Sequence, residues 1–432
     1  MDNTLKIRQK SFDKLLNRGQ RKNEKNWEML CSSQFPLVPF IGAGMSAWCY
    51  KTWSRLLKDI VAENYSAMCA DIVDKALNCT EKPDFKDAAN KSNFHWMEEI
   101  AECIFDDNEE DYKKNVEKFV LKNKTSTKTA DSILRQLRYY VGNEGINKKS
   151  AAVKALYREF DSELMNEHGR VPEYQSYFHR LFKGVLITTN YDRALEKCYP
   201  SLFSYSYRDL NQSVQNLNAN NEDKESWLYQ AVIAKISQMK SQLERNDLTP
   251  DEGVTVPDVP MLLKVHGSIE QASSIALSRK GYDEAYQGVM PKLLREIFKS
   301  TTIIFLGYSL GEDRILDELK KAKDESEKNS SIKFPPHFAF LSRKWEEEDD
   351  KKFAEVLEKK YGVYPIFYDE DIMPVEMCNN QMERKVYFHD YCLGLLMENL
   401  LRRKMYYPQP PEMLWDKFRY DNLTATELVN QS

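Results

Sequence analysis

The stretch Pro36-Leu-Val-Pro-Phe-Ile-Gly-Ala-Gly-Met-Ser-Ala47 decides the fold, because an apolar strand runs directly into a glycine turn. Gly42, Gly44 and Ala47 have the G-x-G-x-x-G/A spacing, which allows a tight turn and a close approach of the backbone to a pyrophosphate. Ser46 is placed to cap a following helix, whose free N–H groups would face the phosphates. A tight strand-to-helix turn without a ligand explains the same residues, so this stretch leaves the ligand open.

Three further apolar stretches end in glycine or polar groups. They are residues 184–192 (GVLITTNYD), 261–269 (MLLKVHGSI) and 301–313 (TTIIFLGYSLGED). The first ends at Asn190 and Asp192, and the second at His266 and Gly267. Parallel sheets bind ligands outside the carboxyl ends of their strands. The sequence therefore predicts a Rossmann-like, doubly wound α/β fold with a mostly parallel sheet, in which these residues converge.

Each of these residues also has a purely structural interpretation. A single histidine after a strand is more often a hydrogen-bonded structural residue than a catalyst, which applies to His266. Asn190 and Asp192 could form an Asx-type turn. The joint occurrence of such residues at successive strand ends favours a functional site.

Together these segments resemble the SIR2-like family, in the branch found in bacterial antiphage defence. The resemblance covers roughly residues 35–370 and is carried by GAGMS (42–46), TTNYD (188–192), KVHGSI (264–269), GYD (281–283) and FLGYS (305–309). It implies NAD as the substrate, His266 as the catalytic histidine, and Asn190 and Asp192 at the nicotinamide riboside.

The same resemblance implies which residues bind the rest of the NAD molecule. The phosphates would be bound at the glycine turn, and the late motif would contact the ribose or the adenine. These residues are Gly42, Ala43, Gly44, Ser46, Thr189, Gly267, Asp283, Gly307 and Ser309.

The cysteines separate this chain from the deacylase branch of the family, which carries a zinc module with two Cys-x-x-Cys pairs. The eight cysteines stand at positions 31, 49, 69, 79, 103, 198, 378 and 392, so none of them has that spacing. No structural zinc or other metal site is expected. The loss of the module favours cleavage of NAD itself over protein deacylation.

The expected reaction is hydrolysis of NAD to ADP-ribose and nicotinamide. Positive charge builds on the ribose as nicotinamide leaves, so Asp192 offers a negative charge and Asn190 can orient water or the ribose hydroxyls. With an ordinary pKa of about 6.5, His266 can act as a base near neutral pH.

Three different functions also remain open. The chain could be an NAD-dependent protein deacylase, or a scaffold that binds NAD or ADP-ribose without turnover. Gly307-Tyr-Ser-Leu-Gly311 also matches the nucleophile elbow of α/β-hydrolases, with Ser309 as the nucleophile, Asp369 or Asp371 as the acid and His389 as the base. That hydrolase assignment leaves the other motif strands without a role.

Composition excludes several classes of protein. With 432 residues and a formal net charge of -5, the chain gives no electrostatic sign of direct nucleic-acid binding. No apolar run is long enough to span a bilayer, and the charged start of the chain is unlike a secretory signal. Scattered cysteines fit a reducing cytoplasm.

The order of the motifs predicts the domain organisation. Residues 1–34 form an N-terminal helical arm, residues 35–375 form the SIR2-like domain, and residues 376–432 form a C-terminal helical tail. Helical insertions occupy about 54–182 and 205–258, and the second contains an Asn-rich loop from residue 211 and a helix over 227–243.

An NAD-consuming effector needs a trigger, and the sequence contains no recognisable sensor domain. By resemblance we expect a homo-oligomer that is regulated by a protein in another chain, either a HerA-type ATPase or an Argonaute-type protein.

Overall fold

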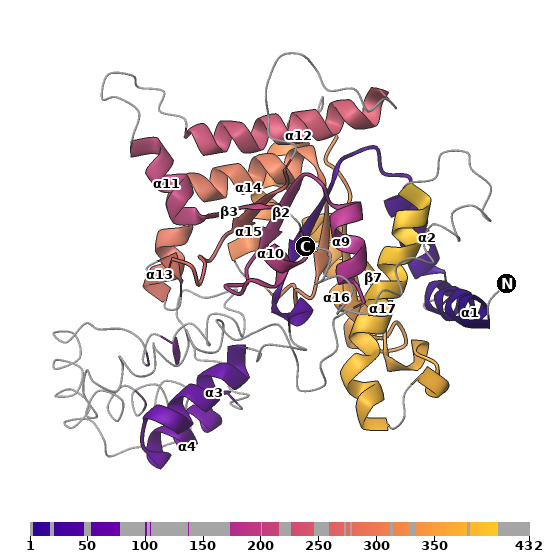
Figure 1. Ribbon diagram of the computed structural model, residues 1–432, viewed down its shortest axis with the longest axis horizontal. Coiled ribbons are helices and arrows are strands. Elements are labelled where there is room, and N and C mark those ends of the chain that lie inside the picture. Colours follow the sequence, from indigo (N-terminus) through magenta and orange to yellow (C-terminus); the bar gives the residue numbers. More distant parts are fainter. Residues whose placement is uncertain are drawn as a thin grey trace.

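The computed structural model shows a layered α/β protein (Figure 1). It describes residues 3–17, 21–46, 53–77, 100–101, 104, 137, 173–199, 201–215, 226–245, 259–271, 274–276, 279–311, 314–328, 333–377 and 381–404. Much of the helical insertion expected at about 54–182, namely residues 78–99, 102–103, 105–136 and 138–172, lies outside the described residues.

Seven strands in the described residues form one sheet, and every pairing in it is parallel. They are β1 (Leu37–Ile41), β2 (Val185–Thr188), β3 (Phe203–Ser206), β4 (Met261–Lys264), β5 (Thr302–Leu306), β6 (His337–Ser342) and β7 (Val363–Tyr368). Their order is β3-β4-β2-β1-β5-β6-β7. This parallel sheet confirms the predicted doubly wound, Rossmann-like class.

The direction of winding reverses beside β1. The chain passes from β1 to β2 on one side, and after β4 it returns to place β5 on the other side of β1. Such a reversal opens a crevice at the carboxyl ends of the strands. The four strands that carry the sequence motifs are neighbours in the order β4-β2-β1-β5, so their ends meet at one edge.

Alternate side chains along each strand supply two separate cores. In β5, Ile303 and Phe305 pack on one face, while Ile304 and Leu306 pack on the other. The first core includes residues of α11 (Tyr207–Gln215), α12 (Trp227–Arg245), α14 (Val289–Ser300), α15 (Arg314–Lys328) and α16 (Glu348–Val356). The second includes residues of α1 (Asn3–Asn17), α2 (Lys22–Cys31), α9 (Gln175–Leu181), α10 (Ala194–Lys197) and α17 (Gln381–Lys404).

Both ends of the described chain pack against the sheet. The helix expected over the first 34 residues is in fact two helices, α1 and α2, because Arg21 between them takes a left-handed φ of 69°. Arg8 in α1 contacts Glu173 at 2.5 Å and Glu398 in α17 at 2.6 Å. The N-terminal arm and the C-terminal helix therefore contribute to the second core, on the side where α1, α2 and α17 lie in Figure 1.

The insertions are helical where they are described. The first contains α3 (Trp53–Asn64), α4 (Ala67–Leu77) and α9, and in the second α12 confirms the helix expected over 227–243. The loop expected from residue 211 is wrong as far as residue 215, because α11 continues to that point. Its Asn211 side chain accepts the N–H of Val289 at 3.1 Å, a tertiary contact that favours the helix over the Asn-rich composition.

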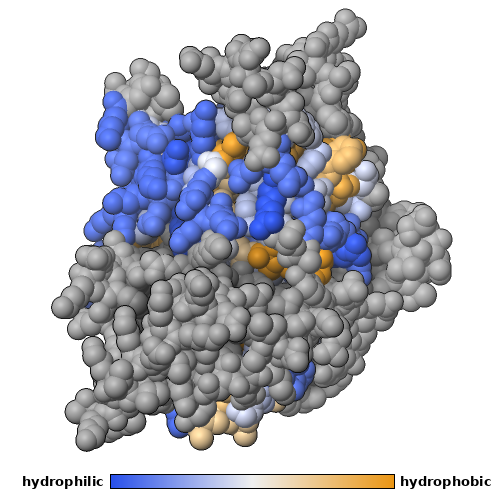
Figure 2. Space-filling model, turned by 90° about the vertical axis from the view of Figure 1, so that its left-hand side faces the viewer, coloured by the Kyte–Doolittle hydropathy of each residue, from blue (hydrophilic) through white to orange (hydrophobic). Residues whose placement is uncertain are grey.

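The sheet edge at β3 was not predicted. Phe203 and Trp227 are 43% and 54% exposed there, although hydrophilic side chains cover most of the described surface on that side of the molecule (Figure 2). The remaining short elements are the 3-10 turns η1 (Ala43–Met45), η4 (Glu370–Ile372) and η5 (Val375–Met377), the π turn η3 (Leu357–Tyr361), and α13 (Arg279–Ala285).

Candidate functional site

The loops after β1 and β5 interlock through their backbones. The N–H of Gly42 donates to the carbonyl of Leu306 at 2.9 Å, and that of Gly44 donates to the carbonyl of Gly307 at 2.8 Å. A Cβ on Gly42 would lie 2.5 Å from the Gly307 oxygen and 2.7 Å from the Cα of Tyr308, closer than real contacts permit. Gly307 has a φ of 60°, a backbone angle that residues with a side chain rarely adopt. These glycines are required by the contact between the two loops.

This contact changes what the glycine turn can offer to a phosphate. The N–H groups of Gly42 and Gly44 already have acceptors, which are the carbonyls of Leu306 at the end of β5 and of Gly307 directly after it. Ala43 and Gly44 are exposed, whereas Gly42 is buried. Ser46 follows the single 3-10 turn η1. Residues 47–52, where the expected helix would begin, lie outside the described residues, so the capping role of Ser46 stays a prediction. Phosphate binding by this turn stays a prediction.

Asn190 is held in one orientation at the end of β2. Its side-chain Nδ2 donates to the carbonyl of Gly42 at 3.2 Å and to the hydroxyl of Ser46 at 3.1 Å, and its own N–H donates to the Thr188 hydroxyl at 3.0 Å. Because a carbonyl can only accept, the amide nitrogen must face Gly42. The Oδ1 atom is buried, and within the described structure it has no hydrogen-bond partner.

An orphaned buried acceptor is costly, by about 1–3 kcal/mol. Native proteins retain such groups where a ligand or water supplies the missing donor. Asn190 is 7% exposed, so its Oδ1 is shielded from bulk solvent. The amide is thus ready to accept a hydrogen bond at the carboxyl end of β2, beside the reversal point of the sheet.

Asp192 is buried two residues further on. Its Oδ1 accepts the N–H of Ala194 at 2.8 Å, which is the Asx-type turn that the structural interpretation predicted, at the start of α10. Burial raises the pKa of this carboxyl, while the N–H of Ala194, the charge of Lys264 and the hydroxyl of Ser46 oppose the rise. Ser46 therefore contacts both Asn190 and Asp192 and links the two predicted site residues.

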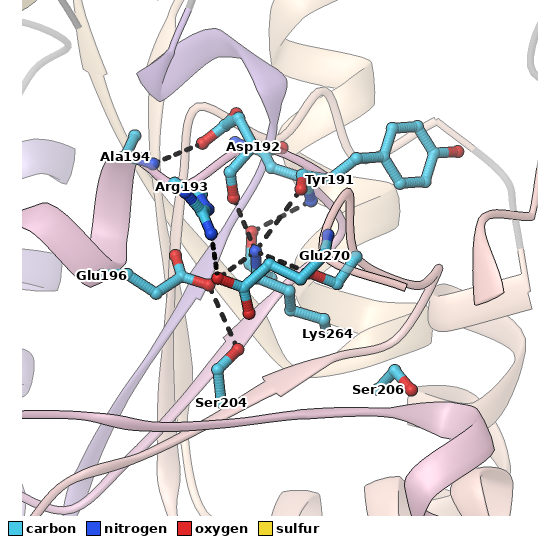
Figure 3. A network of polar contacts seen from close by, with 12 residues as sticks. Tyr191, Asp192, Arg193, Ala194, Glu196, Ser204, Ser206, Lys264 and Glu270 are labelled. Carbon is cyan, nitrogen blue, oxygen red and sulfur yellow. Dashed lines mark hydrogen bonds and ion pairs between the residues drawn. The ribbon is translucent and has the colours of Figure 1, made fainter. Parts of the chain in front are cut away.

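Lys264 joins the loop after β2 to the loop after β4, as Figure 3 shows. Its fully buried Nζ lies 2.6 Å from the carbonyl oxygen of Asp192 and 3.4 Å from that of Tyr191. It also lies 3.4 Å from the hydroxyl of Ser268 and 2.6 Å from a carboxylate oxygen of Glu196. One ammonium group thus fixes the chain on both sides of the predicted site.

A second ion pair joins the same two loops at the surface. Arg193 and Glu270 lie 2.6 Å apart, and each side chain is 45% exposed (Figure 3). The loops are therefore bridged by one buried charge, that of Lys264, and by one solvated pair.

His266 follows β4 in a buried position. Its Nε2 lies 3.0 Å from the Tyr286 hydroxyl, and its ring meets the Tyr282 ring edge to face at a centroid distance of 4.8 Å. Burial and the nearby charge of Arg314 lower the pKa of His266 to about 3. The expectation of an ordinary pKa is wrong, because a histidine that is 4% exposed resists protonation. The imidazole is neutral at physiological pH and can still accept a proton.

Asp283 contacts a guanidinium group. Its carboxylate lies 2.7 Å from Arg314, whose guanidinium carbon stands 5.4 Å from the centre of the Tyr282 ring and 6.0 Å from that of Tyr286. Asp283 was expected to contact NAD directly, and that role stays a prediction. The observed contact holds Arg314 beside the aromatic rings that touch His266.

The sequence model of the SIR2-like domain family matches residues 184–366. This chain contains a SIR2-like domain. The match confirms the family resemblance, and it includes Asn190, His266 and the loop after β5, while the glycine turn after β1 precedes it. A search of curated proteins found no match to the chain. The SIR2-like domain supports a function that involves NAD.

The remaining predicted contacts of the SIR2-like domain lie along the same edge. The N–H of Thr189 donates to the carbonyl of Ile41 at 3.1 Å, which ties the end of β2 to that of β1. Gly267 has φ of 97°, and a Cβ there would overlap the backbone of Ser274. Ser309 is exposed in the loop after β5. Their roles in binding NAD stay predictions.

The partners proposed for Ser309 in a hydrolase triad have other contacts. Asp369 accepts the N–H of Asp371 at 3.0 Å, and the Nδ1 of His389 lies 3.5 Å from the hydroxyl of Tyr368. Asp369 directly follows β7, and His389 is an exposed residue of α17.

No group of three or more His, Cys, Asp or Glu side chains that could hold a metal ion occurs among the described residues. Likewise, none of the described helices combines the length and the apolar character that a membrane crossing needs.

Sequence reasoning assigned no role to Lys264, Glu196, Tyr286 or Arg314. The position of Lys264 inside the apolar stretch MLLKV could have indicated its role, because a charge in a buried strand requires partners. Tyr286 and Arg314 carry no such signal, since Tyr286 follows the short helix α13 and Arg314 begins the amphipathic helix α15. Only the fold brings them to His266.

Proposed function

We propose that this protein is an NAD glycohydrolase that converts NAD to ADP-ribose and nicotinamide. The observation that carries the proposal is the buried Oδ1 of Asn190, which has no hydrogen-bond partner among the described residues. It stands at the carboxyl end of β2 in a SIR2-like domain, and the neutral imidazole of His266 follows the neighbouring strand β4. Hydrolysis at a ribose carbon needs a group that orients water or a ribose hydroxyl and a base that accepts the proton of the water. The Oδ1 of Asn190 and the imidazole of His266 offer these two functions at adjacent strand ends.

In the proposed reaction, the bond between the ribose carbon and the nicotinamide nitrogen breaks, and its electron pair leaves with nicotinamide as a neutral molecule. Positive charge then builds on the ribose. Water adds to that carbon and loses a proton, which His266 accepts. Asn190 orients the water or a ribose hydroxyl through Oδ1, because its Nδ2 is already engaged by Gly42 and Ser46.

Asp192 has a smaller electrostatic part in this scheme than its position in the sequence suggests. Burial raises the pKa of its carboxyl, and one oxygen is occupied by the N–H of Ala194. We assign it mainly to positioning, because the same turn fixes the backbone that follows Asn190.

The test is NAD turnover by the purified wild type, Asn190→Ala and Ser309→Ala, with nicotinamide and ADP-ribose separated by chromatography. We expect Asn190→Ala to lower kcat by at least about a hundredfold, as for the loss of one positioned polar group. Ser309→Ala, an exposed residue of the neighbouring loop, should change KM by less than about tenfold. Loss of turnover in Ser309→Ala alone would instead favour the serine hydrolase.

The same assay distinguishes a glycohydrolase from a deacylase and from a binding scaffold. Release of nicotinamide only in the presence of an acyl-lysine peptide would identify a deacylase. Tight NAD binding by calorimetry without turnover, even with a regulatory partner, would identify a binding scaffold.

We further propose that the activity serves bacterial antiphage defence by depleting NAD in the cytoplasm. The support is the motif resemblance. A homo-oligomer regulated by a HerA-type ATPase or an Argonaute-type protein would meet the need for a trigger. Light scattering of the purified chain tests oligomerisation, and co-purification with each candidate tests the partner. A monomer that binds neither would oppose this part of the proposal.

A further inference from the structure

Two tyrosines contact the ring of His266, and they do so differently. Tyr282 lies in α13 and meets the imidazole edge to face, with ring centroids 4.8 Å apart. Its hydroxyl lies 3.1 Å from the hydroxyl of Tyr191. Tyr286 follows α13, and its hydroxyl lies 3.0 Å from Nε2 of His266. One tyrosine therefore packs on the imidazole, while the other forms a hydrogen bond with it.

The hydrogen bond to Tyr286 constrains the chemistry of the imidazole. A neutral histidine has one N–H donor and one acceptor nitrogen, and the hydrogen bond at one nitrogen decides which is which. His266 is buried and neutral, so this choice persists over the physiological pH range. The Tyr286 hydroxyl can donate to Nε2 or accept from it, so the direction of this hydrogen bond and the tautomer of the ring are set together.

Tyr286 is itself held in place by charge. The guanidinium of Arg314 stands 6.0 Å from the centre of its ring, and Arg314 is fixed by Asp283 at 2.7 Å. A cation over an aromatic face is attracted by the negative charge of that face, which stabilises the arrangement. Asp283, Arg314 and Tyr286 therefore form a chain of contacts that ends at Nε2 of His266.

We propose that Tyr286 is a positioning residue for the NAD cleavage proposed above. Its hydroxyl fixes the tautomer and the ring orientation of His266 in which the imidazole takes up the proton. This inference rests on the proposed function for its role in turnover. The tautomer itself is a property of the resting protein and can be measured without a substrate.

The test compares Tyr286→Phe with Tyr282→Phe in the full-length chain. Both variants keep the aromatic ring and lose one hydroxyl, but only Tyr286→Phe removes the hydrogen bond to His266. We expect Tyr286→Phe to lower kcat for NAD by about 10–100-fold. This is the range for residues that hydrogen-bond to a functional histidine and orient its ring, as in metal sites. Its KM and its calorimetric Kd for NAD should change less than about twofold, and Tyr282→Phe should stay within about threefold of the wild-type kcat.

A second measurement separates positioning from general damage. The chain has six histidines, so the ring-nitrogen resonances of His266 can be assigned in 15N-histidine-labelled protein by comparison with His266→Gln. We expect Tyr286→Phe to change the His266 nitrogen shifts toward a mixture of tautomers, and Tyr282→Phe to leave them in place.

Unchanged His266 nitrogen shifts in Tyr286→Phe would overturn the proposal, as would equal losses of kcat in the two variants. If the wild type does not consume NAD, the proposed function fails while the nitrogen shifts still decide whether Tyr286 fixes the imidazole.

Discussion

Two pairs of loops at the carboxyl ends of the strands are held together by different kinds of contact. The loops after β1 and β5 meet through backbone atoms, with glycine carbonyl and N–H groups so close that no side chain fits between them. The loops after β2 and β4 meet through the buried ammonium of Lys264 and carry the polar side chains of Asn190 and His266. Glycine spacing in this chain accounts for loop packing, whereas the proposed chemistry depends on polar side chains at strand ends.

The largest effect is expected on the backbone side, from Gly307→Ala. A side chain at φ of 60° costs about 1–2 kcal/mol, and the overlap of its Cβ with the Met45 nitrogen adds about 1–3 kcal/mol. We expect a loss of about 3–4 kcal/mol in the free energy of unfolding, measured by urea denaturation.

Gly311→Ala is the matched control in the same loop. A Cβ there would meet only the Ser309 hydroxyl oxygen, at 3.9 Å, so we expect a change below about 1 kcal/mol. Equal stabilities for the two alanine variants would contradict the interlocking of the loops.

On the polar side, Lys264→Met should cost about 3 kcal/mol. The substitution leaves the carboxylate of Glu196 without its cation and the carbonyl of Asp192 without a donor. The double variant Lys264→Met/Glu196→Gln should lose less free energy of unfolding than the two single variants lose together, because the unpaired charge is gone. Strict additivity in denaturation experiments would show that the pair does not act as a unit.

The polar side should also respond to pH. His266 has a pKa of about 3 in the folded protein and about 6.5 when unfolded, so the unfolded state binds more protons between these values. The contribution of neutral His266 to the free energy of unfolding is therefore complete above pH 6.5. It is lost as the pH falls, and the loss reaches about 2 kcal/mol at pH 5. His266→Gln should lose correspondingly less stability between pH 7 and pH 5 than the wild type.

Buried His337, whose pKa burial also lowers to about 3, remains in both proteins and cancels in that comparison. Parallel pH profiles for the two proteins would mean that His266 is solvated in solution. Gly311→Ala, on the backbone side, should reproduce the wild-type profile.

The smallest effect should come from Arg193→Gln. This residue bridges the same two loops as Lys264, but its pair with Glu270 is about half exposed, and such pairs contribute about 0–1 kcal/mol. We expect less than about 0.5 kcal/mol in thermal or urea unfolding, and this difference should vanish at high salt. A loss as large as that of Lys264→Met would remove the distinction between the buried and the exposed bridge.

The strands with strong apolar runs could be predicted from sequence, because burial of β1, β2, β4 and β5 on both faces leaves continuous hydrophobic stretches. The edge strand β3 could not, since its sequence FSYS is short, half polar and partly exposed. The positions of Asn190, Asp192 and His266 at strand ends were also predictable, because polar residues directly follow apolar runs.

The contacts of these residues were beyond the reach of sequence patterns. The acceptors of the Gly42 and Gly44 N–H groups lie at the end of β5 and in the loop after it, more than 250 residues away in the chain. The lowered pKa of His266 depends on burial and on Arg314 from α15, which no local spacing encodes. A glycine motif therefore indicates a tight loop, while its ligand depends on the partners that the fold brings to it.

The most direct test of the central claim is NAD consumption by the wild type beside His266→Ala, with both proteins shown to unfold cooperatively. We predict that the wild type, alone or with the proposed regulatory partner, releases equal amounts of nicotinamide and ADP-ribose, and that His266→Ala releases neither. Full turnover by a folded His266→Ala protein would contradict the account, because it would place the chemistry away from the polar strand ends.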